Sequence, residues 1–162
     1  MVNGQAARVS LRKVSTGEPM VRAINVLEGL LAYERAIGGS AAIAEVRRKG
    51  EEYLLERQLL RRKSTGEIVN PAWQQFSFPV RWHYDVLRGL EYFRSVGETT
   101  DSRMQEAIDL VRSKQRPDGT WPLENTYPGK IHFALEDGDG RPSRWSTLRA
   151  LRVLSWYEQA AA

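Results

Sequence analysis

Cysteine is absent from this chain of 162 residues, and long apolar runs are absent as well. The lack of cysteine excludes disulfides, thiolate nucleophiles and zinc sites with cysteine ligands. No segment approaches the roughly 18–20 consecutive apolar residues of a membrane-spanning helix, and the N-terminus lacks the apolar stretch of a secretory signal. We therefore expect a soluble, cytoplasmic protein with no membrane span.

A strong charge of one sign is also missing, because 24 basic residues face 20 acidic ones and leave a net charge of +4. Most of the basic residues are arginines that alternate with acidic residues, as in segment 51–57. The longest uninterrupted basic runs are the short segments 47–49 and 61–63. Such mixing is typical of helix faces covered by salt bridges, and we expect no nucleic-acid partner.

Apolar residues at 3/4 spacing predict five helices in a single domain. Gly38-Gly39 is expected to end the first helix, and Ser40 is expected to cap the second. The predicted helices cover residues 19–37, 40–62, 80–95, a segment from about 100, and 143–158. Residues 1–18 are interpreted as an N-terminal extension of a domain at 19–160. The fifth helix has apolar residues on more than one face, so we expect it to be the most buried.

One pattern occurs twice, 57 residues apart: a small residue, a large apolar pair, and a glutamine. It runs from Gly50 to Gln58 and again from Ala107 to Gln115. The second copy continues to Gly119 and Trp121. A fixed period of this length is typical of helical repeat architectures.

A second pattern, Leu-charged-small-Leu, occurs in the helices that lie between these copies. It occupies segments 27–30, 87–90 and 148–151. Two self-similar classes of helix therefore alternate, which predicts a layered all-α array with small residues where helices approach closely. The long connections 64–79 and 116–142 both lead into a helix of this second class. Because both carry several aromatic residues, we expect ordered loops on one face of the array.

The second copy of the first pattern resembles the QW motif of squalene and oxidosqualene cyclases, and its repeat is shared more loosely with protein prenyltransferases. The resemblance implies an α/α toroid, with inner helices around a cavity and outer helices around those. In that family the glutamine and tryptophan stack and tie outer helices together, so Gln115, Gly119 and Trp121 would do so here. Gln58 would belong to a decayed copy, since Ile68 stands where tryptophan is expected.

Five helices are fewer than a complete toroid of this family contains, so the resemblance implies a partial toroid. An open arc leaves apolar helix flanks at its ends, and exposed patches of this kind usually mark interfaces. We therefore expect a second copy or another chain to complete the toroid, and an apolar, isoprenoid-like ligand is a further expected partner.

The acidic clusters of these enzymes are missing from the sequence. Proton-initiated cyclases use Asp-x-Asp-Asp, and the nearest match, Asp137-Gly138-Asp139, is better explained as a turn. The Asp-Asp-x-x-Asp of magnesium-dependent terpene synthases and the Asp, Cys and His zinc ligands of prenyltransferases are also not found. We expect no metal and no cofactor.

Segment 81–85 holds the most suggestive polar residues. His83 and Asp85 are weak candidates for a catalytic acid and base. The alternative is that Asp85 stabilises the N-terminus of the following helix. The candidate ligand-binding aromatics are Trp82, Tyr84 and Trp145.

These observations predict a non-catalytic scaffold of the cyclase and prenyltransferase type that binds an apolar ligand or another protein. The alternative is a subunit or fragment of a terpenoid cyclase-like enzyme whose acid comes from another chain. The missing acid cluster favours the scaffold.

Overall fold

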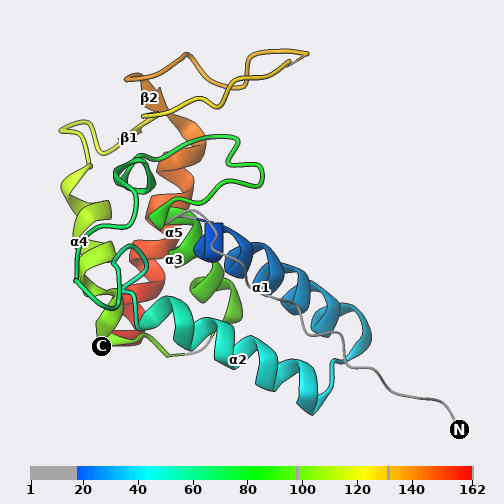
Figure 1. Ribbon diagram of the computed structural model, residues 1–162. Coiled ribbons are helices and arrows are strands. Elements are labelled where there is room, and N and C mark those ends of the chain that lie inside the picture. Colours follow the sequence, from blue (N-terminus) through cyan, green and yellow to red (C-terminus); the bar gives the residue numbers. More distant parts are fainter. Residues whose placement is uncertain (1–17, 98, 131, 162) are drawn as a thin grey trace, which may run out of the picture.

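The computed structural model describes residues 18–97, 99–130 and 132–161, and the chain is mostly helical (Figure 1). Except for Glu18, the predicted N-terminal extension lies outside the described residues. The elements are α1 (Glu18–Ile37), α2 (Ala41–Leu55), η1 (Pro71–Gln74), α3 (Val86–Val96), η2 (Ser102–Met104), α4 (Gln105–Ser113), β1 (Trp121–Pro122), β2 (Pro142–Ser143) and α5 (Arg144–Ala161). No described helix is long and apolar enough to cross a membrane.

Helices α1 and α2 form an antiparallel pair, as Figure 1 shows. The predicted cap is confirmed, because the Ser40 hydroxyl accepts a hydrogen bond from the Ile43 amide at 3.3 Å. The predicted close approach at Gly50 is also confirmed. A Cβ atom at this position would lie 2.8 Å from a methyl group of Leu27. Glycine therefore lets the two helices pack closely at this level.

The prediction that the second helix continues to about Arg62 is wrong, because α2 ends at Leu55. Gln58 and Leu59 adopt left-handed backbone conformations, with φ of 48° and 66°. They reverse the chain into a small hairpin, in which the Val69 amide donates to the Leu60 carbonyl at 2.9 Å. A helix cannot pass through residues with positive φ.

The third helix also begins later than predicted, at Val86 and not near Val80. Segment 80–85 is non-helical, and Arg81 has a φ of 53°. Asp85 is the N-cap of α3, and Gly97 ends the helix in a left-handed conformation. The apolar spacing of segment 80–86 imitates a helix, but its residues belong to the loop that precedes the cap.

Helices α1, α3 and α5 form one layer with α3 between the other two, while α2 packs on α1 and α4 packs on α3 (Figure 1). Arg88 of α3 bonds Glu28 of α1, and Arg35 of α1 bonds the Ser95 carbonyl of α3. Both pairs are 60 residues apart, so α1 and α3 run in the same direction. The Leu-charged-small-Leu helices therefore lie side by side.

Burial differs sharply within this layer, and the prediction that the fifth helix is the most buried is wrong. In α3, Leu87 and Leu90 are both 0% exposed. In α5, the matching Leu148 and Leu151 are 45% and 49% exposed. The reason is that α3 lies between α1 and α5, whereas among the described elements α5 has a helix of this layer on its α3 side alone.

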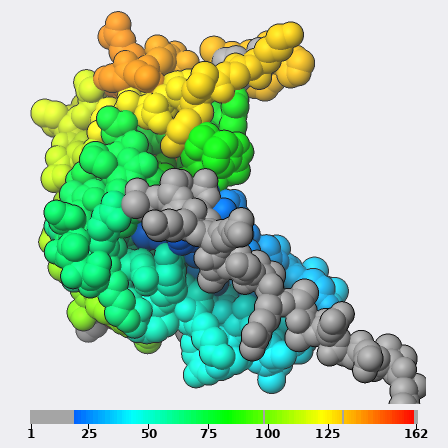
Figure 2. All heavy atoms as spheres, in the orientation of Figure 1, coloured from blue at the N-terminus to red at the C-terminus, as the bar shows by residue number. Residues whose placement is uncertain are grey.

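The two long loops lie together at the end of the molecule where α5 begins, and residues 126–130 and 132–140 project from the body (Figures 1 and 2). The Glu124 amide donates to the Phe76 carbonyl at 2.9 Å, which joins the loops directly. Arg81 donates to the Pro128 carbonyl, and Arg144 donates to the Leu135 carbonyl. The expected turn at Gly138 is confirmed by a hydrogen bond from the Arg141 amide to the Gly138 carbonyl.

Candidate functional site

The buried carboxylate of Asp85 lies where the first long loop enters α3. Its Oδ1 atom accepts the Arg88 amide at 2.7 Å, which makes Asp85 the N-cap of the helix. Its Oδ2 atom accepts the Ser77 hydroxyl at 3.1 Å, and the Arg149 guanidinium lies 3.7 Å from Oδ1. The helix-capping interpretation of Asp85 is therefore confirmed. Its oxygens are occupied by structural partners.

Two buried arginines link the three helices of the layer. The Arg88 Nε donates to Glu28 of α1 at 2.9 Å, and the Arg149 Nε donates to Glu91 of α3 at 2.6 Å. Both occupy the charged position of the Leu-charged-small-Leu pattern. The arginine at this position in α3 and in α5 therefore forms an ion pair with a glutamate of the neighbouring helix that precedes it in the layer. In each pair the arginine is buried and the glutamate is partly exposed, so removing the glutamate would leave a buried positive charge without its partner and destabilise the fold.

The predicted pair of His83 and Asp85 does not form in the structure. The His83 ring stacks between Trp82 and Tyr127, with ring centroids 3.8 and 3.5 Å away. Burial lowers the pKa of His83, and the positive charges of Arg81 and Arg88 lower it further. A histidine with these neighbours favours the neutral form, which suits stacking and gives no charged partner for Asp85.

The three candidate ligand-binding aromatics lie in different environments. Tyr84 is buried in the core, where its hydroxyl donates to the Leu59 carbonyl at 2.6 Å, and burial raises its pKa. Trp82 is exposed, and Trp145 stacks on Phe78 with a centroid distance of 5.1 Å. Only the two tryptophans therefore present surface to an external ligand.

Trp121 joins α4 to α5. Its indole Nε1 donates to the Val111 carbonyl of α4 at 2.7 Å, and its amide donates to the Thr147 hydroxyl of α5 at 2.9 Å. Gly119 shapes the preceding turn with a φ of 82°. Gln115 is exposed and lines a groove together with Trp121. Gln58 lies in the reversal after α2, so the stacking role expected from the resemblance stays a prediction.

The outer flanks of the layer carry exposed apolar side chains. On α5 these are Leu148 and Leu151, and Leu151 lines a groove of about 510 Å³ with Trp121 and Leu154. On α1 a stripe spaced by seven and four residues is exposed: Val26, Tyr33 and Ile37. Residues of α1 that hydrogen-bond α3, among them Glu28 and Arg35, lie on another side of the helix. Both ends of the row therefore carry exposed apolar side chains.

Sequence reasoning missed a group of arginines near the C-terminal ends of α1 and α3. The Arg94 Nε is buried without a hydrogen-bond partner among the described residues. Burial lowers the pKa of Arg94, and the nearby charges of Arg152 and Arg35 lower it further. The nearby Glu91 is bound to Arg149. No sequence motif marks this group, because its members come from three separate helices.

Within the described residues, no group of three His, Asp or Glu side chains could hold a metal ion. His132 lies in the projecting loop and is exposed.

Comparison with known protein families, with curated proteins and with solved structures finds no match for this chain. The resemblance to squalene cyclases and prenyltransferases therefore stays a prediction from the repeats.

Proposed function

We propose that this protein is a non-catalytic helical-repeat scaffold, a partial toroid of the squalene cyclase and prenyltransferase type, that works by packing its open ends against a second copy. The observation that carries this proposal is the exposure of Leu148 and Leu151 on α5, at repeat positions that are buried on α3. Isolated exposed apolar residues are common, but a helix flank that repeats a buried interface indicates a missing neighbour.

The two ends of the row are different surfaces, so the contact between copies is head to tail. The α5 flank of one copy meets the stripe Val26, Tyr33 and Ile37 on α1 of the next, and each copy continues the row of helices. Such heterologous contacts close into a ring or extend into a filament, depending on the rotation between copies.

The groove of about 510 Å³ beside Leu151 would seat an apolar, isoprenoid-like ligand, and native mass spectrometry would report any such ligand that co-purifies.

Sedimentation velocity at micromolar concentrations tests the proposal. The unmodified chain should sediment as an assembly, and the double variant Leu148→Ser/Leu151→Ser should sediment as a monomer. Val46→Ser is the matched control, because Val46 is a similarly exposed apolar residue on α2. A monomeric unmodified chain would overturn the proposal.

The alternative of a cyclase-like enzyme subunit requires a carboxylic acid that faces substrate. Asp85 is the buried carboxylate of the predicted site, and its oxygens are used to cap α3. A capping carboxylate is not free to face a substrate, so the scaffold is the better-supported function.

A further inference from the structure

Three exposed aromatic rings lie at the end of the molecule that carries the projecting loop. Phe133 and Trp82 are 70% and 63% exposed, the highest values among the large apolar side chains of the described residues, and Trp145 is also exposed. Figure 2 shows the projecting loop, in yellow and orange, next to a bulge formed by a green segment. We call these three residues and the half-buried Tyr127 the aromatic tip.

Stacking within the protein holds two of the exposed rings. Trp82 belongs to a three-ring stack that ends at Tyr127, and Trp145 stacks on Phe78. Phe78, Tyr127 and Phe133 line one small cavity of about 110 Å³, so all the rings of the aromatic tip belong to one connected cluster. Because the stacked side chains are already ordered, binding through them loses little conformational entropy.

The aromatic tip projects from the molecule and does not enclose a ligand (Figure 2). The cavity between its rings, about 110 Å³, is well below the roughly 300–1,000 Å³ of small-molecule sites. Exposed rings on a projection instead fit a partner into which they can insert. The headgroup region of a lipid bilayer is such a partner, because tryptophan combines an apolar body with a polar edge and favours this interface.

Positive charge surrounds these rings. Lys130 is exposed in the projecting loop, and Arg81 and Arg144 each donate to a backbone carbonyl of that loop. Among the described residues, none of these three cations forms an ion pair with an acidic side chain. Segment 126–135 contains no acidic residue. Cations beside exposed aromatic rings favour a membrane surface that contains anionic lipids.

The acidic residues of the projecting loop follow this segment, where the chain returns to the body. Glu136 accepts a hydrogen bond from an amide of α5 at 3.2 Å, and Asp139 accepts the Thr126 hydroxyl at 2.6 Å. Asp137 lies between them, and Arg141 offsets part of their charge. The cations and the acids therefore occupy different parts of the loop.

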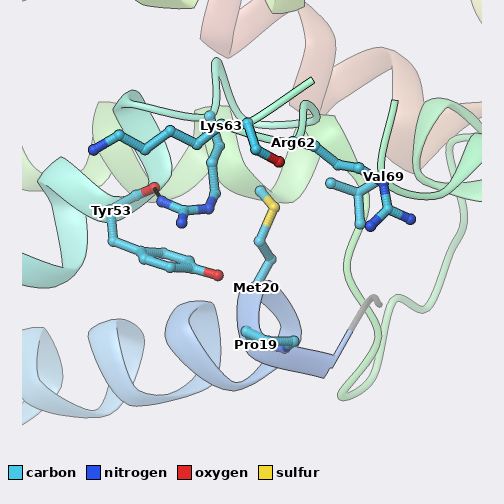
Figure 3. A pocket seen from close by; sticks show the side chains of 8 residues that line it. Pro19, Met20, Tyr53, Arg62, Lys63 and Val69 are labelled. Atoms are coloured by element: carbon cyan, nitrogen blue, oxygen red, sulfur yellow. Dashed lines mark hydrogen bonds between the residues drawn. The ribbon is translucent and has the colours of Figure 1, made fainter. Parts of the chain in front are cut away.

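The cations that follow α2 are arranged differently. Figure 3 shows the Arg62 and Lys63 side chains on opposite sides of Met20, and Lys63 pairs with Glu56 at 2.6 Å. These cations are spread apart and partly neutralised. Lys63 is therefore a suitable control for a lysine of the aromatic end.

We propose that the aromatic tip binds the surface of an anionic phospholipid bilayer, with its exposed rings in the headgroup region and the three cations against lipid phosphates. The tip is complete within one copy, so vesicle binding does not require the assembly of copies described above.

Cosedimentation of the full chain with lipid vesicles tests this assignment. The chain should bind vesicles of mixed phosphatidylcholine and phosphatidylglycerol, and it should bind vesicles of phosphatidylcholine alone more weakly, because these lack the anionic lipid. Added salt should weaken binding to the mixed vesicles. Tryptophan fluorescence should shift to shorter wavelength on binding, because Trp82 and Trp145 leave water.

Two substitutions at exposed positions of the projecting loop locate the site. Phe133→Ser should lower the partition coefficient for the mixed vesicles by about tenfold or more, because its ring no longer leaves water. Lys130→Gln should lower it by about fivefold, because a cation near an anionic membrane surface is lost. Val46→Ser and Lys63→Gln are the matched controls, since both residues lie outside the aromatic tip.

Three outcomes overturn the proposal. The first is that the unmodified chain does not bind the mixed vesicles, which would leave the exposed rings to a protein partner. The second is that Phe133→Ser and Lys130→Gln both bind as tightly as the unmodified chain. The third is that the control substitutions weaken binding as much as the substitutions in the projecting loop.

Discussion

Helices α3 and α5 carry the same Leu-charged-small-Leu pattern but have opposite surroundings. In α3 both leucines are buried, whereas in α5 both are about half exposed. The pattern determines which side chains a helix presents on its surface. Whether those side chains are buried depends on the presence of neighbouring helices. The comparison shows that α5 lies at the end of the row of helices that the structure describes.

The polar contacts of the two helices extend this comparison. Asp85 at the start of α3 caps its helix and also receives Ser77 and Arg149. Ser146 occupies the matching place in α5, 61 residues further along (85 to 146), and its hydroxyl is buried without a hydrogen-bond partner among the described residues. At this repeat position the Asp85 carboxylate of α3 therefore has several polar partners, whereas the Ser146 hydroxyl of α5 has none among the described residues.

The largest expected difference comes from truncating the same leucine in both helices. Leu87→Ala should lower the free energy of unfolding by about 2–5 kcal/mol, because it leaves a cavity in the core. Leu148→Ala should change it by less than about 0.5 kcal/mol, because its side chain is half exposed. Urea unfolding at low protein concentration, where copies are separate, measures both. Equal losses would refute the contrast between the helices.

Next in size is the effect of the capping position. Asp85→Ala should lower the free energy of unfolding by about 2–4 kcal/mol, since it removes the helix cap and the buried charge beside Arg149. Ser146→Ala should be neutral or slightly stabilising, because its hydroxyl has no partner to lose. Asp85→Asn keeps the cap and should recover part of the loss. The comparison fails if Ser146→Ala is as damaging as Asp85→Ala.

The smallest expected effect concerns pH. Burial and two nearby arginines lower the pKa of His83 below its usual value of 6.5. The unfolded chain therefore binds a proton at higher pH than the folded chain does, so the stability present above about pH 6.5 declines as the pH falls below it. His83→Gln should reduce this dependence in urea unfolding between about pH 7.5 and 5.5. His132→Gln, at an exposed loop residue, should retain it, and an unchanged slope in His83→Gln would show that the stack does not hold a neutral imidazole.

Local features of the sequence predicted local structure well. The first helix, the Ser40 cap and the tight packing at Gly50 depend on residues with strong conformational or steric preferences. The end of α2 could not be predicted, because Gln58 and Leu59 adopt positive φ without a glycine or asparagine to signal it. The failure matters for the fold, since this reversal turns the chain after α2 into the hairpin that joins Leu60 and Val69.

Features that depend on neighbouring helices were beyond sequence reasoning. The exposure of Leu148 follows from a missing neighbour, which no pattern within α5 records. The pairing of Arg88 with Glu28 and of Arg149 with Glu91 required knowledge of which helices lie side by side. The repeat predicted that these helices form one class, and the structure adds that their charged positions connect them.

Disulfide cross-linking between copies tests the central claim of a head-to-tail contact most directly, because the natural chain has no cysteine to interfere. Tyr33→Cys places a thiol on the α1 flank of one copy, and Leu151→Cys places one on the α5 flank of another. A disulfide requires Cα atoms within about 7 Å, so a mixture of the two variants should cross-link much faster than either variant alone. In the control mixture, Arg48→Cys replaces Tyr33→Cys. The account is contradicted if the mixture of Tyr33→Cys and Leu151→Cys cross-links no faster than this control.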